Sequence, residues 1–128
     1  MIKDTYKMEV IPDSRFHYIR FSGVWGKDTA KPFINEAVKS FFESGRKYTL
    51  VDMRKQEQKT NPFYDYYSIQ EMYEAKVYKI RKIAVLDSLV RKEDNDFFEL
   101  TAQNHNINIR FFYSEDEAIR WLTNEDSQ

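Results

Sequence analysis

Two short apolar runs, each followed by an aspartate, constrain the fold of this chain most strongly. The first, Lys47–Arg54, reads Lys-Tyr-Thr-Leu-Val-Asp-Met-Arg, and the second, Lys82–Ser88, reads Lys-Ile-Ala-Val-Leu-Asp-Ser. Neither run shows the regular polar–apolar alternation of a half-exposed strand, so each is typical of a strand covered on both faces. Because parallel strands present their carboxyl ends at one edge of a sheet, Asp52 and Asp87 are candidate site residues there.

The remaining sequence predicts a hairpin before these strands and helices between them. Residues 6–10 alternate in polarity, and the turn residues 12–14 precede a second strand that starts at Phe16, so the first strand is expected at the sheet edge. Helices are expected from Asp28 or Thr29 to Gly45, over residues 62–78, over residues 94–103 and from Ser114 to Leu122, with a last strand over residues 107–112. The element order is therefore ββαβαβαβα. We predict an α/β fold: a single-layer, mixed, mostly parallel five-stranded sheet with four helices.

Apolar spacing also predicts which helix faces turn inward. In the second helix the expected inward residues are Tyr66, Ile69, Tyr73, Val77 and Ile80, which leaves Tyr64, Tyr67 and Tyr78 for other faces. In the third helix the expected inner residues are Phe97, Leu100, Thr101 and Asn104. The surplus of aromatic residues on the second helix predicts a pocket wall or an interface there.

Length and composition narrow the class of protein. We expect one domain over residues 1–128, in which the polar residues 123–128 fray as a tail. The sequence lacks cysteine, which excludes disulfide frameworks and thiolate nucleophiles. It has no apolar leader and no apolar run of membrane length, so we expect a cytoplasmic protein without integral membrane association. With a net charge of −1, no overall field attracts nucleic acid.

Few residues in the sequence suggest catalysis. His17 and His105 have no carboxylate at metal-ligand spacing, and no glycine-rich phosphate loop follows a strand. We therefore expect no metal, no cofactor and no enzymatic activity. Asp52 with Arg54, and Asp87 with Ser88, form a candidate polar site, with the alternative that each aspartate pairs with Arg54 or Arg91 for structural reasons.

The end of the chain resembles a known family. Residues 107–122 read Ile-Asn-Ile-Arg-Phe-Phe-Tyr-Ser-Glu-Asp-Glu-Ala-Ile-Arg-Trp-Leu, which is similar to the closing signature of the bacterial SpoIIAA-like family. The runs Leu50–Arg54 and Lys82–Leu86 lie where that family has its aspartate-bearing strand and its Lys-Ile-Ala-Val strand. The resemblance implies a STAS / CRAL-TRIO-like architecture and a role in binding or regulation. It does not imply catalysis.

One part of the sequence departs from that family. Anti-sigma-factor antagonists of the STAS group carry an Asp-Ser-Ser-Gly motif after the aspartate strand, and a partner kinase phosphorylates its serine. Here Lys59–Phe63 reads Lys-Thr-Asn-Pro-Phe, without the serine pair and the glycine. Thr60 is therefore the one nearby hydroxyl that a kinase could phosphorylate. Capping of the next helix is an alternative role for Thr60.

Two hypotheses of function follow from the sequence. The first is a non-catalytic bacterial regulatory domain that binds a protein partner or a second copy of itself as a homodimer. Its contact surface would be the expected loop Lys55–Thr60 and the second helix, including Tyr64 and Tyr67. The alternative is a carrier or enzyme for a small apolar, lipid-like or anionic ligand bound near Asp52, Arg54 and Tyr64.

Overall fold

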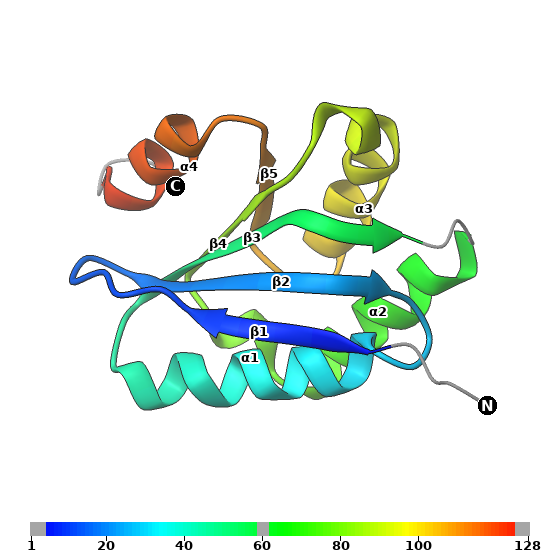
Figure 1. Cartoon of the computed structure of the whole chain (residues 1–128), viewed down its shortest axis with the longest axis horizontal. Helices are drawn as coiled ribbons and strands as arrows, with labels where there is room; N and C mark the ends of the chain where they lie inside the picture. Colours follow the sequence, from blue (N-terminus) through cyan, green and yellow to red (C-terminus); the bar gives the residue numbers. More distant parts are fainter. Residues whose placement is uncertain (1–4, 59–61, 125–128) are drawn as a thin grey trace.

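The strands form a single mixed sheet. The computed structural model describes residues 5–58 and 62–124, with the backbone alone for residues 58 and 62–67. Within these ranges the sheet has five strands in the order β1-β2-β3-β4-β5 (Figure 1). They are β1 (Tyr6–Val10), β2 (His17–Trp25), β3 (Tyr48–Gln58), β4 (Lys82–Leu86) and β5 (Ile109–Phe112). β1 pairs antiparallel with β2, and the other neighbours are parallel. The mixed, mostly parallel sheet with β1 at its edge is therefore confirmed.

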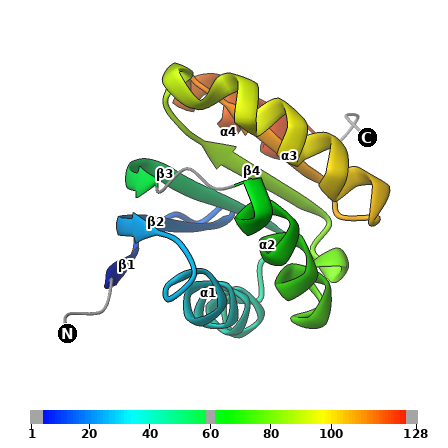
Figure 2. The ribbon, with the colours of Figure 1, turned by 90° about the vertical axis from the view of Figure 1, so that its right-hand side faces the viewer.

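Helices cover both faces of this sheet. The described ranges contain α1 (Ala30–Ser44), α2 (Pro62–Glu74), α3 (Lys92–Asn104), α4 (Glu115–Thr123) and two 3₁₀ turns, η1 (Val77–Lys79) and η2 (Leu89–Arg91). Figure 2 shows α1 and α2 on one side of the strands and α4 on the other. The core is divided in the same way: α1, α2 and α3 share one apolar cluster with the sheet, and α4 packs on a smaller cluster.

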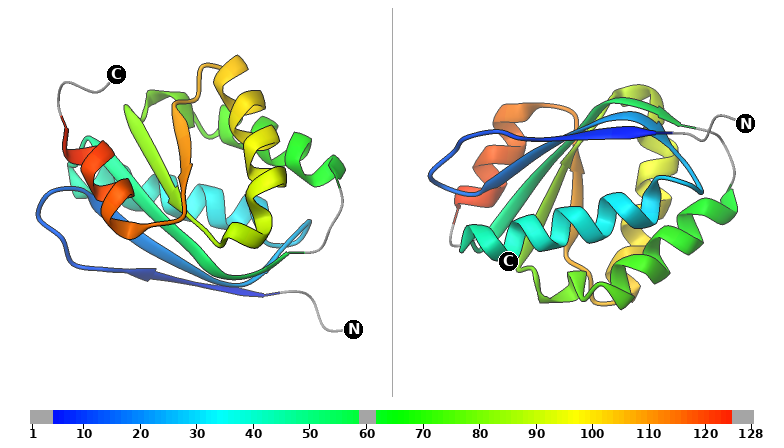
Figure 3. Two further views of the ribbon diagram at one scale, coloured as in Figure 1. Left: turned by 90° about the horizontal axis from the view of Figure 1, so that it is seen from above. Right: turned by 60° about the horizontal axis from the view of Figure 1, so that its bottom comes forward.

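Several element boundaries follow the local chemistry that the sequence indicates. Gly45 ends α1 with a left-handed φ of 71°, and Asn106 has a φ of 61° after α3. Both residue types tolerate this conformation better than others. Ser114 caps α4 through its side chain, which accepts a hydrogen bond from the Glu117 amide. Figure 3 shows α4 beside the turn of the β1–β2 hairpin, and Phe16 from that hairpin belongs to the smaller apolar cluster.

The predicted loop after the third strand is partly wrong. β3 continues to Gln58, because its second half pairs in parallel with the end of β2, where Lys55 lies opposite Ser22 and Gln58 opposite Trp25. Asp52 and Arg54 therefore lie inside the strand. The end of the expected loop, at residues 59 and 60, lies outside the described residues.

The second helix is shorter than predicted. α2 ends at Glu74, and Lys76 adopts a positive φ of 65° before η1 begins. Ile69, Val77 and Ile80 are buried as expected. Tyr73 is 52% exposed instead of inward, and its ring lies beside the Tyr78 ring, with centroids 5.0 Å apart and the two planes tilted by 35°.

The predicted inner face of the third helix is wrong. Phe97 is 62% exposed and Leu100 is 59% exposed, whereas Asn95, Phe98 and Ala102 are buried. Two contacts set this orientation of α3. Asn95 Nδ2 donates to Asp87 at 2.9 Å, and the Phe98 ring meets the Phe111 ring edge-on with centroids 5.8 Å apart.

Candidate functional site

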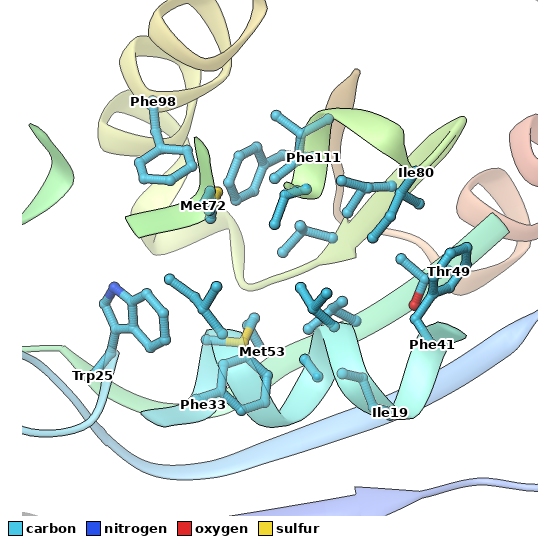
Figure 4. A pocket seen from close by; sticks show the side chains of 18 of the residues that line it. Ile19, Trp25, Phe33, Phe41, Thr49, Met53, Met72, Ile80, Phe98 and Phe111 are labelled. Carbon is cyan, nitrogen blue, oxygen red and sulfur yellow. The ribbon is translucent and has the colours of Figure 1, made fainter. Parts of the chain in front are cut away.

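An apolar pocket of about 120 Å³ lies between the sheet and the helices α1, α2 and α3. Its walls are mostly aliphatic and aromatic side chains from β2, β3, β4, β5 and these helices. Figure 4 shows Trp25 and Phe98 at one end of the pocket and Phe41 and Thr49 at the other. Hydrophobic pockets with a few placed polar groups are the usual form of small-molecule sites.

Four polar residues are among those that line the pocket: Thr49, Gln56, Asp94 and Asn95. No lysine, arginine or histidine is among the described lining residues. An anion that entered this pocket would lose its hydration without gaining a cation in return. The chemistry of the lining therefore favours neutral molecules.

Asp87 organises the polar end of the pocket. This buried carboxylate follows β4 and pairs with Arg91 at 2.6 Å. It also accepts hydrogen bonds from Asn95 Nδ2 at 2.9 Å and from Gln56 Nε2 at 3.3 Å. Because an ionised carboxylate only accepts hydrogen bonds, both amide groups must turn their nitrogen atoms toward it.

This orientation leaves one acceptor without a donor. Gln56 Oε1 is a buried atom with no hydrogen-bond partner among the described residues. A buried carbonyl oxygen without a partner costs about 1–3 kcal/mol. Gln56, which is one of the residues that line the pocket, therefore carries an unsatisfied acceptor.

The other end of the pocket carries a histidine between two hydroxyl groups. Thr49 Oγ1 lies 2.8 Å from His17 Nδ1, and Ser40 Oγ lies 2.8 Å from His17 Nε2. Burial lowers the pKa of His17. The ring is therefore favoured as neutral, and a hydroxyl occupies the place that a carboxylate takes in a catalytic triad.

A separate ionic network lies on the α4 face of the sheet. Asp52 is 1% exposed and accepts hydrogen bonds from Arg54 at 3.0 Å and from Arg20 at 3.1 Å. Burial raises the pKa of Asp52, but the hydrogen bonds from Arg54 and Arg20 outweigh it, so the pKa lies below its usual value. Nearby, the Tyr18 hydroxyl donates to Glu115 at 2.8 Å.

The structure separates the residues that the sequence proposed as one site. Asp52 and Arg54 form one pair, whereas Asp87 joins the pocket side through Gln56 and Asn95. Thr60 lies outside the described residues, and Tyr64 and Tyr67 belong to α2 with side chains that are not described. Arg54 and Arg91 pair with the aspartates as the structural alternative expected.

The sequence alone does not identify Gln56 or Asn95 as site residues. Gln56 stood in a polar stretch that indicated a loop, and Asn95 stood between charged residues at the start of a helix. The one signal for Asn95 is its position eight residues after Asp87, within reach of the end of β4.

Four large apolar side chains of η2 and α3 are exposed, and we call this set the η2–α3 patch. It consists of Leu89, Val90, Phe97 and Leu100, which are 66%, 84%, 62% and 59% exposed. Phe97 and Leu100 lie three residues apart on α3 and so share one face of the helix. Neighbouring exposed apolar groups are typical of interaction sites. The acidic residues Glu93, Asp94 and Asp96 of α3 are exposed beside it.

Two kinds of feature are absent from the described residues. No cluster of three or more histidine, aspartate or glutamate side chains that could hold a metal ion occurs in residues 5–58 and 62–124. Within the same ranges no helix is both long and apolar enough to span a membrane.

Comparison with known proteins identifies the fold. No protein-family model and no curated protein sequence matches the chain. An anti-sigma factor antagonist from Mycobacterium paratuberculosis superposes with a TM-score of 0.60 at 11% identity, over 90% of this chain and 92% of that one. An uncharacterized protein from the DUF3478 family of Shewanella loihica PV-4, with a SpoIIAA-like fold, superposes with a TM-score of 0.60 at 10% identity, over 95% and 97%. The chain therefore has the SpoIIAA-like fold that its closing residues indicated.

Proposed function

We propose that this protein is a non-catalytic regulatory domain that acts by binding another protein through the η2–α3 patch. The exposure of Phe97 and Leu100 is the observation that carries the proposal. They lie three residues apart on α3, so they project from one face of the helix. A fold shared with an anti-sigma factor antagonist, a protein named for its action against another protein, is consistent with this role.

The charges around the patch favour a basic partner. Lys92 against Glu93, Asp94, Asp96 and Glu99 leaves α3 with a formal charge of −3. Two copies of this acidic face would repel each other, so a second copy of the chain fits poorly. The complementary partner presents apolar side chains that are surrounded by lysine or arginine residues.

The main buried polar side chains already form hydrogen bonds within the protein, which supports a role without catalysis. Both ring nitrogens of His17 contact hydroxyl groups, and the oxygens of Asp52 and Asp87 accept hydrogen bonds from arginine side chains. Groups held in this way serve stability better than proton transfer. The proposal assigns binding to the surface and assigns these groups to the structure.

The proposal is tested by comparing variants against a purified partner. Affinity capture from the native cell extract supplies candidate partners, and titration calorimetry then measures each purified candidate. The double variant Phe97→Ser/Leu100→Ser should weaken binding about tenfold or more. Phe42→Ser is the matched control, because Phe42 is 50% exposed on α1.

Two further measurements test whether charge attracts the partner and whether the partner is a second copy of the chain. Raising the salt concentration should weaken binding by the wild-type protein, because surface charge attraction is screened. Light scattering should show a monomer for the wild-type protein. A dimer that the double variant disrupts, or a partner that binds the double variant as tightly as the wild type, would contradict the proposal.

A further inference from the structure

We propose that the apolar pocket binds a small neutral molecule that has an apolar body and one hydrogen-bond donor, and that the donor bonds to Gln56 Oε1. This proposal does not depend on the η2–α3 patch. It rests on the size of the pocket, on the charge of its lining and on the orientation of the Gln56 amide.

The size of the pocket sets the size of the ligand. An engineered apolar cavity of about 150 Å³ in another protein stays dry and binds benzene. The pocket here, at about 120 Å³, is comparable. A single aromatic ring or a short branched hydrocarbon fits this volume, whereas a long lipid chain does not.

The lining selects against charged ligands. Asp87 is already neutralised by Arg91, which bonds to it through Nε at 2.9 Å and through Nη2 at 2.6 Å. Asp94, which also lines the pocket, carries a negative charge. A carboxylate ligand would therefore meet like charge and find no cation in the described lining.

The side-chain amide of Gln56 favours a ligand that carries a hydrogen-bond donor. Its nitrogen is held by Asp87 at 3.3 Å, so its oxygen must point elsewhere, and that oxygen has no partner in the described part of the chain. A ligand hydroxyl or N–H group would supply the missing hydrogen bond. Apolar ligands of equal size that lack a donor would leave the oxygen unsatisfied.

Three single-ring probes separate these properties: phenol, toluene and benzoate. We would titrate each into the protein and follow the methyl signals of Ile19, Val51, Met53 and Met72, which line the pocket, by two-dimensional NMR. Phenol should bind about tenfold more tightly than toluene, which corresponds to one hydrogen bond. Benzoate should cause no shift of these signals.

Two variants and a control assign the binding to the pocket. Gln56→Leu should lower the affinity for phenol about tenfold and leave toluene unchanged. Gln103→Leu, at an exposed position of α3, should change neither affinity. Ala37→Leu, which places a larger side chain in the pocket, should weaken both probes while the methyl spectrum shows a folded protein.

Several outcomes would overturn the proposal. These are tightest binding by benzoate, equal affinities for phenol and toluene, or an unchanged preference for phenol in Gln56→Leu. Shifts that Ala37→Leu does not reduce would place the probes elsewhere. The absence of any shift at the pocket methyl groups in the folded wild-type protein would also overturn it.

Discussion

The ammonium group of Lys82 donates a hydrogen bond of 2.9 Å to the backbone carbonyl oxygen of Trp121, at the end of α4. It donates a second, also of 2.9 Å, to the carbonyl oxygen of Asn124. The same group lies over the Tyr48 and Trp121 rings, 5.2 and 5.3 Å from their centroids. A buried lysine at the start of β4 therefore caps the last helix, where a positive charge is favourable.

Replacing this lysine should loosen α4. Lys82→Met keeps most of the side-chain volume but removes the two hydrogen bonds, so we expect the free energy of unfolding to fall by about 2 kcal/mol. Urea unfolding measures this change. Lys79→Met, at an exposed position, is the control and should change the free energy by less than about 0.5 kcal/mol. Equal stability of the two variants would show that the cap contributes nothing.

His17 should make the protein sensitive to mild acid. Burial lowers the pKa of His17 in the folded state, so below the unfolded value of about 6.5 the unfolded chain binds more protons. Stability should therefore be complete above about pH 6.5 and fall as the pH drops below it. Urea midpoints between pH 7.5 and pH 5 measure the effect.

Two histidine variants assign this dependence. His17→Gln should be less stable at pH 7, because the contacts to Thr49 and Ser40 change, and its stability should depend less on pH in that range. His105→Gln changes an exposed histidine and should keep the wild-type dependence. If the two variants behave alike, His17 is not the titrating group.

Asp52 should stabilise the fold over a lower pH range. Its pKa lies below the usual value although burial raises it, because Arg54 and Arg20 donate hydrogen bonds to it. Its contribution is therefore present above about pH 3.9, the unfolded value, and is lost as the pH falls through the folded pKa. Asp52→Asn should lose about 2 kcal/mol of unfolding free energy at pH 7, the usual size for hydrogen bonds to a charged group.

The difference between wild type and Asp52→Asn should shrink as the pH falls below about 3.9. Urea unfolding at pH 7 and at a series of acidic values measures it. Asp28→Asn, at an exposed position, provides the control and should follow the wild type at every pH. A constant difference between Asp52→Asn and wild type would mean that the ion pairs do not depend on ionisation of Asp52.

The fold could be predicted from the sequence because its main signals are local. The run from Tyr48 to Val51 lacks regular alternation, and Gly45, Asn106 and Ser114 mark helix ends by their own backbone or capping chemistry. These signals do not depend on the rest of the molecule. Together with the alternation of residues 6–10, they predict the element order and the position of β1 at the sheet edge.

The orientation of α3 could not be predicted in the same way. Phe97 and Leu100 have the spacing of core residues, and apolar residues are normally assigned to the core. These two residues face outward because two tertiary contacts orient the helix, the hydrogen bond between Asn95 and Asp87 and the packing of Phe98 on Phe111. The resulting exposed patch is also the surface that the proposed function needs.

The shape of the pocket could not be predicted from the sequence either, because a pocket is a volume that side chains leave unfilled. Phe33, Met53 and Phe98 each look like ordinary core residues, and only their packing across several elements leaves the space. The polar neighbours of Gln56 predict a loop at that point. Its role depends on the pairing of β3 with β2, which extends the strand to that point.

Gly23 should be the least replaceable of the three glycines. It pairs with Tyr6 of β1, and its φ is 123°, a conformation that other residues rarely adopt. A Cβ atom at this position would lie 2.5 Å from the Thr5 carbonyl oxygen and 2.9 Å from the Tyr6 Cα. Both contacts are with backbone, so β1 would have to move away from β2.

We therefore expect Gly23→Ala to lower the free energy of unfolding by about 3 kcal/mol. Urea unfolding measures the loss, and hydrogen exchange should show faster exchange of the β1 amides. Gly26→Ala is the matched control, because a Cβ there meets nothing within 4 Å. Its effect should stay within about 1 kcal/mol, since alanine also restricts the unfolded chain. If Gly23→Ala were as stable as Gly26→Ala, the close approach of β1 to Gly23 would not constrain the sheet.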